Sequence, residues 1–256
     1  MQASQHLAIA AGGTRQQKCD RHGDYESRQV MGRVWTGCPT CIAEANARDD
    51  QRARDDDNER RRRAWSAKLS ASGIPPRFCD RTFDGYAATS DGQRAALDFA
   101  RRLGSDIASG SAFGRCAVFI GRPGTGKTHL AAAVATHAMR SGRSALFTTV
   151  TRLIRRIRDT YNRGSSETES QAVDVFTSPD LLVLDEVGVQ RGTEDEKLLL
   201  FDVLNERYES RRSTILLSNL SVAEMRGYLG ERVFDRMRED GGEVVVFDWN
   251  SHRGQA

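Results

Sequence analysis

The chain has 256 residues, of which 38% are hydrophobic and 29% are charged. This length suits one compact domain with an appendage, and the polar composition indicates that part of the chain has no packed core of its own. No apolar run approaches the roughly 18 residues that a membrane span needs, which excludes an integral membrane protein. The net charge is only +3, so any contact with nucleic acid must come from local clusters of basic residues. Five cysteines, an odd number, favour a protein of the reducing cytoplasm over a disulfide framework.

Residues 1–45 contain cysteine and histidine at the spacing of a zinc site. Cys19 and His22 are separated by two residues, as are Cys38 and Cys41. Such a segment is too small to fold on buried apolar area alone, so a bound metal would supply the missing stability. Four ligands leave no open coordination position, which predicts a structural zinc. A redox pair at Cys38 and Cys41 is the alternative, but the pair lacks the βαβ context of such motifs.

Residues 46–72 are dominated by charge. Between Arg48 and Arg63 there are seven arginines, six acidic residues and no large apolar side chain. Such a segment forms either a solvated helix or a disordered tether, and it cannot bury a core.

Residues 73–256 have the pattern of a doubly wound α/β domain. Five short and continuously apolar runs predict strands covered on both faces of a parallel sheet. These runs are Cys116–Ile120, Ala145–Val150, Leu181–Leu184, Thr214–Leu217 and Glu243–Phe247. Helical spacing lies between them, for example at 129–140 and at 193–212. In the second of these helices Leu198, Phe201, Leu204 and Tyr208 are expected on the buried face.

The sequence GRPGTGKT at 121–128 matches the phosphate-binding pattern G-x-x-x-x-G-K-[ST], with a strand before it and a helix after it. Glycines let successive backbone N–H groups enclose an anion, and the following helix adds its positive end. Lys127 is expected to reach the β- and γ-phosphates of ATP, and the Thr128 hydroxyl to hold Mg²⁺. The nucleotide-binding residues expected are Gly121, Pro123, Gly124, Thr125, Gly126, Lys127, Thr128 and His129.

The segment 150–163 reads as an amphipathic helix with dense positive charge. Leu153, Ile154, Ile157 and Tyr161 share one face, and five arginines stand against a single aspartate. The polar stretch 164–171 that follows is expected to be a mobile loop.

Two further strands end in polar residues. Asp185 and Glu186 follow the third strand, at the edge where open α/β sheets bind their ligands. Asp185 is expected to bind Mg²⁺, and Glu186 to orient and deprotonate the attacking water. Asn219 follows the fourth strand and could contact the γ-phosphate or the lytic water, although an asparagine there is more often a turn residue.

Together these motifs resemble the AAA+ ATPases, and within them the DnaC-type replicative helicase loaders with their IstB-like relatives. The resemblance covers about residues 73–253 and includes LLVLDEVGVQ, LSN and the stretches LGERVFDRMR and FDWNSHR. It implies a five-stranded parallel sheet and, with few residues after the fifth strand, no C-terminal helical lid. It also implies that Asn219 is sensor 1, Arg253 is the sensor-2 arginine, and Arg232 is an arginine finger that reaches the nucleotide of a neighbouring copy. Arg236, four residues later, is the alternative finger.

The resemblance further implies partners. It predicts a hexameric replicative helicase, single-stranded DNA and, on the helicase, other copies of the chain. The single-stranded DNA would contact Arg155, Arg156, Arg158, Tyr161 and Arg163. The alternative for these residues is a solvated helix with Tyr161 in the core. The zinc segment lies outside the resemblance and is expected to contact either the helicase, which we favour, or DNA.

The function expected is therefore ATP-dependent helicase loading during DNA replication. An IstB-like ATPase that assists a DNA transposase is the alternative. A metabolic P-loop kinase is disfavoured because no acceptor-site pattern is present.

Overall fold

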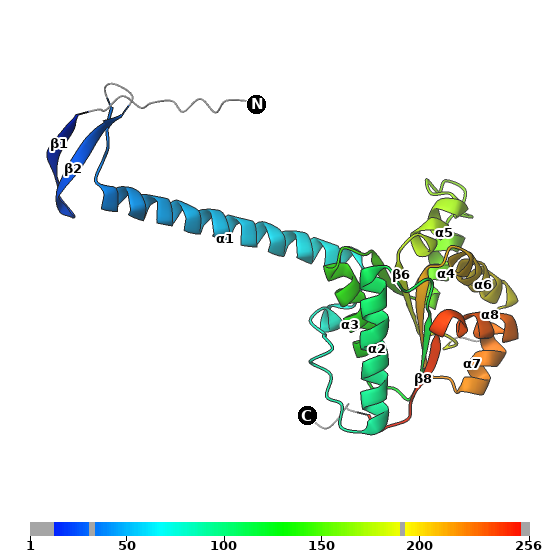
Figure 1. Ribbon diagram of the computed structural model, residues 1–256. Helices are drawn as coiled ribbons and strands as arrows, with labels where there is room; N and C mark the ends of the chain where they lie inside the picture. The colour runs from blue at the N-terminus through cyan, green and yellow to red at the C-terminus, as the bar shows by residue number, and fades with distance from the viewer. Residues whose placement is uncertain (1–12, 31–33, 190–192, 252–256) are drawn as a thin grey trace, which may run out of the picture. The chain divides into compact units, whose positions relative to one another are not determined.

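The computed structural model describes residues 13–30, 34–189 and 193–251. The chain divides into two compact units, with the boundary between Ser66 and Ala67, inside helix α1 (Pro39–Ala71) (Figure 1). In the described ranges, no helix is both long and apolar enough to cross a membrane.

The first unit contains a small antiparallel sheet. Its strands are β1 (Thr14–Cys19), β2 (Gly23–Val30) and β3 (Val34–Trp35), in the order β1-β2-β3. Among the described residues of this unit, only Ser27 and Cys38 are buried. These strands are not evident in the sequence, because neither face of the sheet is apolar enough to produce a hydrophobic alternation.

The charged segment is a helix. It forms most of α1, and none of the residues of α1, all of which the structure describes, is buried. Ion pairs of i,i+3 and i,i+4 spacing support it, such as Asp57 with Arg60 and Arg61, and Glu59 with Arg63. Each exposed pair adds only about 0.3–0.5 kcal/mol, so the helix depends on many of them together.

The second unit contains the five-stranded parallel sheet that the sequence predicts. Its strands are β4 (Ala117–Gly121), β5 (Ala145–Thr149), β6 (Leu181–Asp185), β7 (Ser213–Ser218) and β8 (Glu243–Phe247). Their order in the sheet is β5-β6-β7-β4-β8, and every pair is parallel. The strand that precedes the phosphate loop therefore lies between β7 and β8, inside the sheet.

Helices cover both faces of this sheet (Figure 1). On one face, α2 (Asp91–Ser109) packs against α3 (Lys127–Arg140), and Phe99 of α2 meets Phe119 of β4 edge to face. The other face packs against α4 (Val150–Asp159), α5 (Glu169–Thr177), α6 (Glu194–Glu209), α7 (Val222–Leu229) and α8 (Glu231–Arg236). The even-numbered strand residues Val118, Ile120, Leu182, Leu184 and Leu216 belong to this second core.

Two sequence predictions for this region are wrong in part. The helix predicted at 150–163 ends at Asp159, and α5 begins at Glu169, inside the stretch 164–171 that was expected to be a mobile loop. The cause is a capping box, in which Thr168 and Gln171 each accept a hydrogen bond from the other's backbone N–H. The start of α5 was not predicted because the residues around it are polar.

The buried face of α6 also differs from the prediction. It consists of Leu200, Val203, Leu204 and Arg207, whereas Leu198 is 59% exposed. The unexpected member is Arg207, which is fully buried and forms no ion pair with any residue that the structure describes. Its guanidinium donates hydrogen bonds to the carbonyl oxygens of Phe176, Thr177, Pro179 and Ser213 and to the hydroxyl of Thr214. Burial lowers the pKa of Arg207 to about 9, so the guanidinium still carries its charge at neutral pH.

We expect Arg207→Met to lower the free energy of unfolding by about 3 kcal/mol, because it leaves several buried carbonyl groups without donors. Urea denaturation measures this change. Arg94→Met is the control, because Arg94 is an exposed arginine of α2 with one surface ion pair and should cost less than about 0.5 kcal/mol. Equal stability of the two variants would contradict the role given to Arg207.

Candidate nucleotide-binding site and metal centre

The phosphate loop joins β4 to α3, and glycine is required at both ends of its turn. A Cβ on Gly121, whose φ is +145°, would lie 2.2 Å from the carbonyl oxygen of Phe247. A Cβ on Gly126, whose φ is +99°, would lie 2.6 Å from the ring of Tyr86. Gly126 is the N-cap of α3, so the positive end of this helix faces the inside of the loop. The backbone is therefore shaped to surround an anion.

Lys127 is the centre of the site. Its side chain is nearly buried, and its Nζ donates to the carbonyl oxygens of Gly121 at 2.6 Å and Arg122 at 2.9 Å. A third hydrogen bond, of 3.0 Å, goes to Oδ1 of Asn219, which follows β7. The ammonium thus connects the loop after β4 with the residue expected to act as sensor 1.

Two side chains suited to Mg²⁺ lie beside this lysine. The Thr128 hydroxyl is 3.4 Å from Oδ2 of Asp185, so both could bind one ion. Burial raises the pKa of Asp185, and the charge of Glu186 raises it further, while the hydrogen bond from the Glu186 N–H opposes both effects. A divalent cation would favour the ionised carboxylate.

Glu186 has an unusual backbone. Its φ is +61°, in the left-handed region that non-glycine residues rarely adopt, and its side chain is exposed. Because Glu186 follows Asp185 directly, its carboxylate lies at the same edge of the sheet as the phosphate loop. This position suits a group that must reach a water molecule next to a bound phosphate.

Two aromatic residues behind the loop were missed as part of the site. The indole Nε1 of Trp249 donates to the carbonyl oxygen of Thr125 at 2.8 Å, and the Tyr86 hydroxyl approaches the same oxygen at 3.4 Å. Burial raises the pKa of Tyr86 to about 12, so it remains a neutral donor. His129, expected among the nucleotide-binding residues, shares a hydrogen bond with the carbonyl oxygen of Thr82 and packs against Tyr86. Only the FDWN stretch offered a sequence signal for Trp249.

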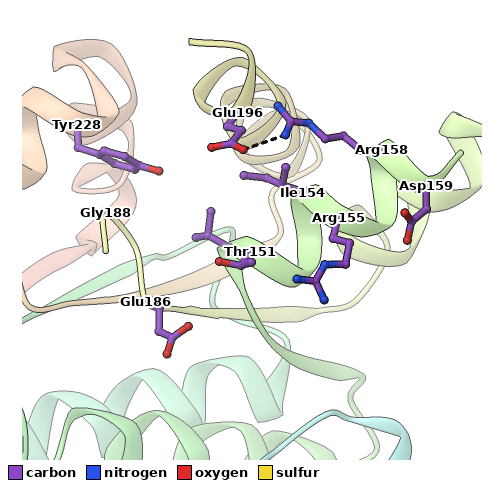
Figure 2. Close-up of a pocket in the computed structure, with 10 residues that line it drawn as sticks. Thr151, Ile154, Arg155, Arg158, Asp159, Glu186, Gly188, Glu196 and Tyr228 are labelled. Carbon is purple, nitrogen blue, oxygen red and sulfur yellow. Dashed lines mark hydrogen bonds and ion pairs between the residues drawn. The ribbon is translucent and has the colours of Figure 1, made fainter. Parts of the chain in front are cut away.

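A cavity of about 340 Å³ lies next to Glu186 (Figure 2). Its walls come from α4, from the segment after β6, and from α6 and α7. The lining residues are Val150, Thr151, Ile154, Arg155, Arg158, Asp159, Glu186, Gly188, Glu196 and Tyr228. The helix expected to contact single-stranded DNA therefore shares a cavity with the residue expected to activate water.

The positive charge on and after α4 is partly neutralised by acidic residues that lie outside the segment 150–163. Arg156 pairs with Glu167 at 2.7 Å, and Arg158 pairs with Glu196 at 2.9 Å. Neither Arg155 nor Arg163 forms an ion pair with another described residue. The Tyr161 ring lies outside the core, because the side chain is 58% exposed and its hydroxyl bonds with Glu169 at 3.1 Å.

The two alternative finger arginines differ in their surroundings. Arg236 contacts its own chain, since its guanidinium donates to Asn205 and lies 4.5 Å from the centre of the Tyr208 ring. Arg232 is exposed, and within the part of the chain that the structure describes its guanidinium has no hydrogen bond or ion pair. Glu231, which could have paired with it, pairs with Arg226. Arg253 lies outside the described residues.

The four residues of the expected zinc site meet in the first unit. The ligand atoms of Cys19, His22, Cys38 and Cys41 all lie within 4.8 Å of one another. Nδ1 of His22 is 3.7, 3.6 and 3.3 Å from the sulfur atoms of Cys19, Cys38 and Cys41, respectively. Three thiols and one imidazole at this separation match the donor set of a tetrahedral structural zinc site.

The fold and the geometry of the phosphate-loop site together define one class of protein. A glycine-rich loop in an inner position of a five-stranded parallel sheet, with an acidic pair after the strand two places away, is the arrangement of P-loop nucleoside-triphosphate-binding proteins with the AAA+ fold.

Comparison with known proteins supports this class and identifies the family to which the chain belongs. Residues 53–254 match the model of the IstB-like ATP-binding proteins, and the chain belongs to this family. The replicative helicase loader DnaC of Escherichia coli (strain K12) is 37% identical over 199 residues, which cover 77% of this chain and 80% of that protein. The loader DnaC of Buchnera aphidicola subsp. Schizaphis graminum (strain Sg) is 37% identical over 185 residues, covering 72% of this chain and 74% of the relative.

A solved structure supports the same relationship. The crystal structure of the DnaC helicase loader superposes with a TM-score of 0.59 at 26% identity. The match covers 67% of this chain and 99% of that chain. The AAA+ fold expected from the sequence is thereby confirmed.

We expect Trp249 to report nucleotide binding by its fluorescence, because its indole is bonded to the phosphate loop. In the variant Trp35→Phe/Trp65→Phe, titration with MgATP should change the emission and reach saturation. The matched control keeps Trp35 instead, in Trp65→Phe/Trp249→Phe, and its emission should not change. If the Trp249 emission stayed unchanged under conditions where labelled nucleotide binds, this would contradict a coupling between Trp249 and the phosphate loop.

Proposed function

We propose that the protein is an ATP-dependent loader of a replicative DNA helicase. The observation that carries this proposal is the 37% identity over 199 residues with the E. coli helicase loader, combined with a complete phosphate loop and acidic pair. The replicative helicase is hexameric, and the loader binds it together with single-stranded DNA.

ATP hydrolysis is assigned to residues at one edge of the sheet. The loop and Lys127 bind the phosphates, while Thr128 and Asp185 hold Mg²⁺. Glu186 deprotonates the attacking water, and Asn219 orients the γ-phosphate or that water. Lys127 donates a hydrogen bond to Oδ1 of Asn219, and this contact supports the role because it holds the amide beside the lysine that binds the β- and γ-phosphates. Arg253 acts as sensor 2.

Hydrolysis depends on assembly with other copies of the chain. A guanidinium from the neighbouring copy stabilises the charge that develops on the transferred phosphoryl group. Arg232 is favoured for this role because it is exposed and forms no hydrogen bond or ion pair with a described residue, so its guanidinium is available to the next subunit. Arg236 already bonds within its own chain.

Single-stranded DNA binds along α4 and the turn that follows it. Arg155 and Arg163 contact backbone phosphates, and Tyr161 offers an exposed face on which a base can stack. Arg156 and Arg158 must exchange their carboxylate partners for phosphates, so they contribute less to the affinity for DNA.

The zinc module binds the helicase. Its fold is stabilised by the metal because it has almost no buried core. The separation of the two units at Ser66/Ala67 supports a module that can stay on its partner while the ATPase unit responds to nucleotide. A transposase helper is the second candidate, since the family takes its name from IstB; the identity with helicase loaders favours the first.

We expect a pull-down with the replicative helicase to separate these roles. Wild type should bind the helicase, and single-stranded DNA should stimulate its ATPase activity more than duplex DNA. Lys127→Ala should lower hydrolysis by about 100-fold or more while docking survives, because it removes a phosphate contact. Cys38→Ser should lose docking. Stimulation by duplex DNA together with no helicase binding would favour the transposase helper, and docking by Cys38→Ser would refute the role of the zinc module.

We expect Arg232→Ala to lower assembly-dependent ATP hydrolysis by about 1,000-fold, with nucleotide binding retained. Mixing Arg232→Ala with Lys127→Ala protein should recover part of the activity. In such a mixture, Arg232 of a Lys127→Ala subunit can reach the intact nucleotide site of a neighbouring Arg232→Ala subunit. Arg236→Ala should instead lower thermal stability. No recovery in the mixture would contradict a finger supplied by the neighbouring copy.

A further inference from the structure

His22 has a partner on each of its ring nitrogens. Nδ1 faces the three cysteine sulfur atoms, and Nε2 lies 3.1 Å from Oε1 of Glu44. Glu44 belongs to α1, three residues after Cys41, so this contact joins the turn between β1 and β2 to the start of the long helix. The other oxygen of Glu44, Oε2, forms an ion pair with Arg21 at 2.9 Å.

This arrangement determines which nitrogen of His22 can bind a metal. A coordinating imidazole nitrogen must present a lone pair, so the proton of the neutral ring stays on the other nitrogen. With Nδ1 bound to the metal, Nε2 would carry the proton and donate a hydrogen bond to Oε1 of Glu44, which lies 3.1 Å away. A carboxylate in this position orients the ring and makes the ligating nitrogen more basic.

We propose that Glu44 is a positioning residue of the zinc site, which holds His22 in the tautomer and orientation that bind zinc through Nδ1. The inference rests on the zinc site of the proposed function and adds a residue that the Cys/His spacing does not contain. Three thiolates and one Zn²⁺ already carry a net charge of −1, and the ion pair with Arg21 offsets the further negative charge of Glu44.

The experiment measures zinc affinity of the full-length protein by competition with a chelator. Glu44→Ala should weaken zinc binding by about 10-fold or more, the effect typical of losing such a partner. Glu44→Gln keeps an acceptor oxygen and should retain most of the affinity. Glu59→Ala is the matched control, because Glu59 is an exposed glutamate of the same helix that forms an ion pair with Arg63, and its loss should leave zinc binding unchanged.

A second measurement separates positioning from general stability. Long-range ¹H–¹⁵N NMR of the zinc-loaded protein should show His22 with a metal-bound Nδ1 and a protonated Nε2, and Glu44→Ala should speed exchange of that proton with solvent. Equal affinity and equal exchange in wild type and Glu44→Ala would overturn the role of Glu44 while leaving the zinc site intact. A wild-type protein that binds no zinc would overturn both.

Discussion

The nucleotide site depends on the parallel register of three strands. β4 pairs with β7 so that Ile120 lies opposite Ser218, and β7 pairs with β6 so that Leu216 lies opposite Leu184. Each strand therefore ends at the same edge, where Gly121 and Asp185, the last residues of β4 and β6, converge with Asn219, which follows β7. Lys127 joins two of the three by hydrogen bonds. A shift of one strand by a single residue would turn its side chains to the opposite face and dismantle the site.

Arginine has three different roles in this chain, and the surroundings of each guanidinium determine which one it has. Arg207 is buried among carbonyl groups and connects α6 with the ends of neighbouring elements. Arg236 and Arg158 bond within the ATPase unit. Arg232 and Arg155 remain available at the surface, and these are the arginines that we assign to a neighbouring copy and to DNA. A guanidinium keeps its charge in all these settings, which makes it suitable for each.

The first unit is stabilised by different interactions from those that stabilise the second. The second buries two apolar layers against its sheet, whereas the sheet of the first has one exposed face and one face that is mostly only partly buried. The cluster of Cys19, His22, Cys38 and Cys41 lies where the turn of the hairpin meets the start of α1. A metal there would replace the missing core, and Glu44 would connect it to the helix that leads toward the ATPase unit.

The sequence by itself determined the AAA+ core, the phosphate loop, the acidic pair and the cluster of three cysteines and one histidine, because each depends on local spacing or on continuous apolar runs. Only the tertiary structure decided which face of α6 is buried and that Trp249 and Tyr86 contact the loop at Thr125. It alone separated Arg232 from Arg236, since both lie on one helix face in the sequence and differ only in what packs against them. Because such contacts join residues that are far apart in the chain, no local sequence pattern predicts them.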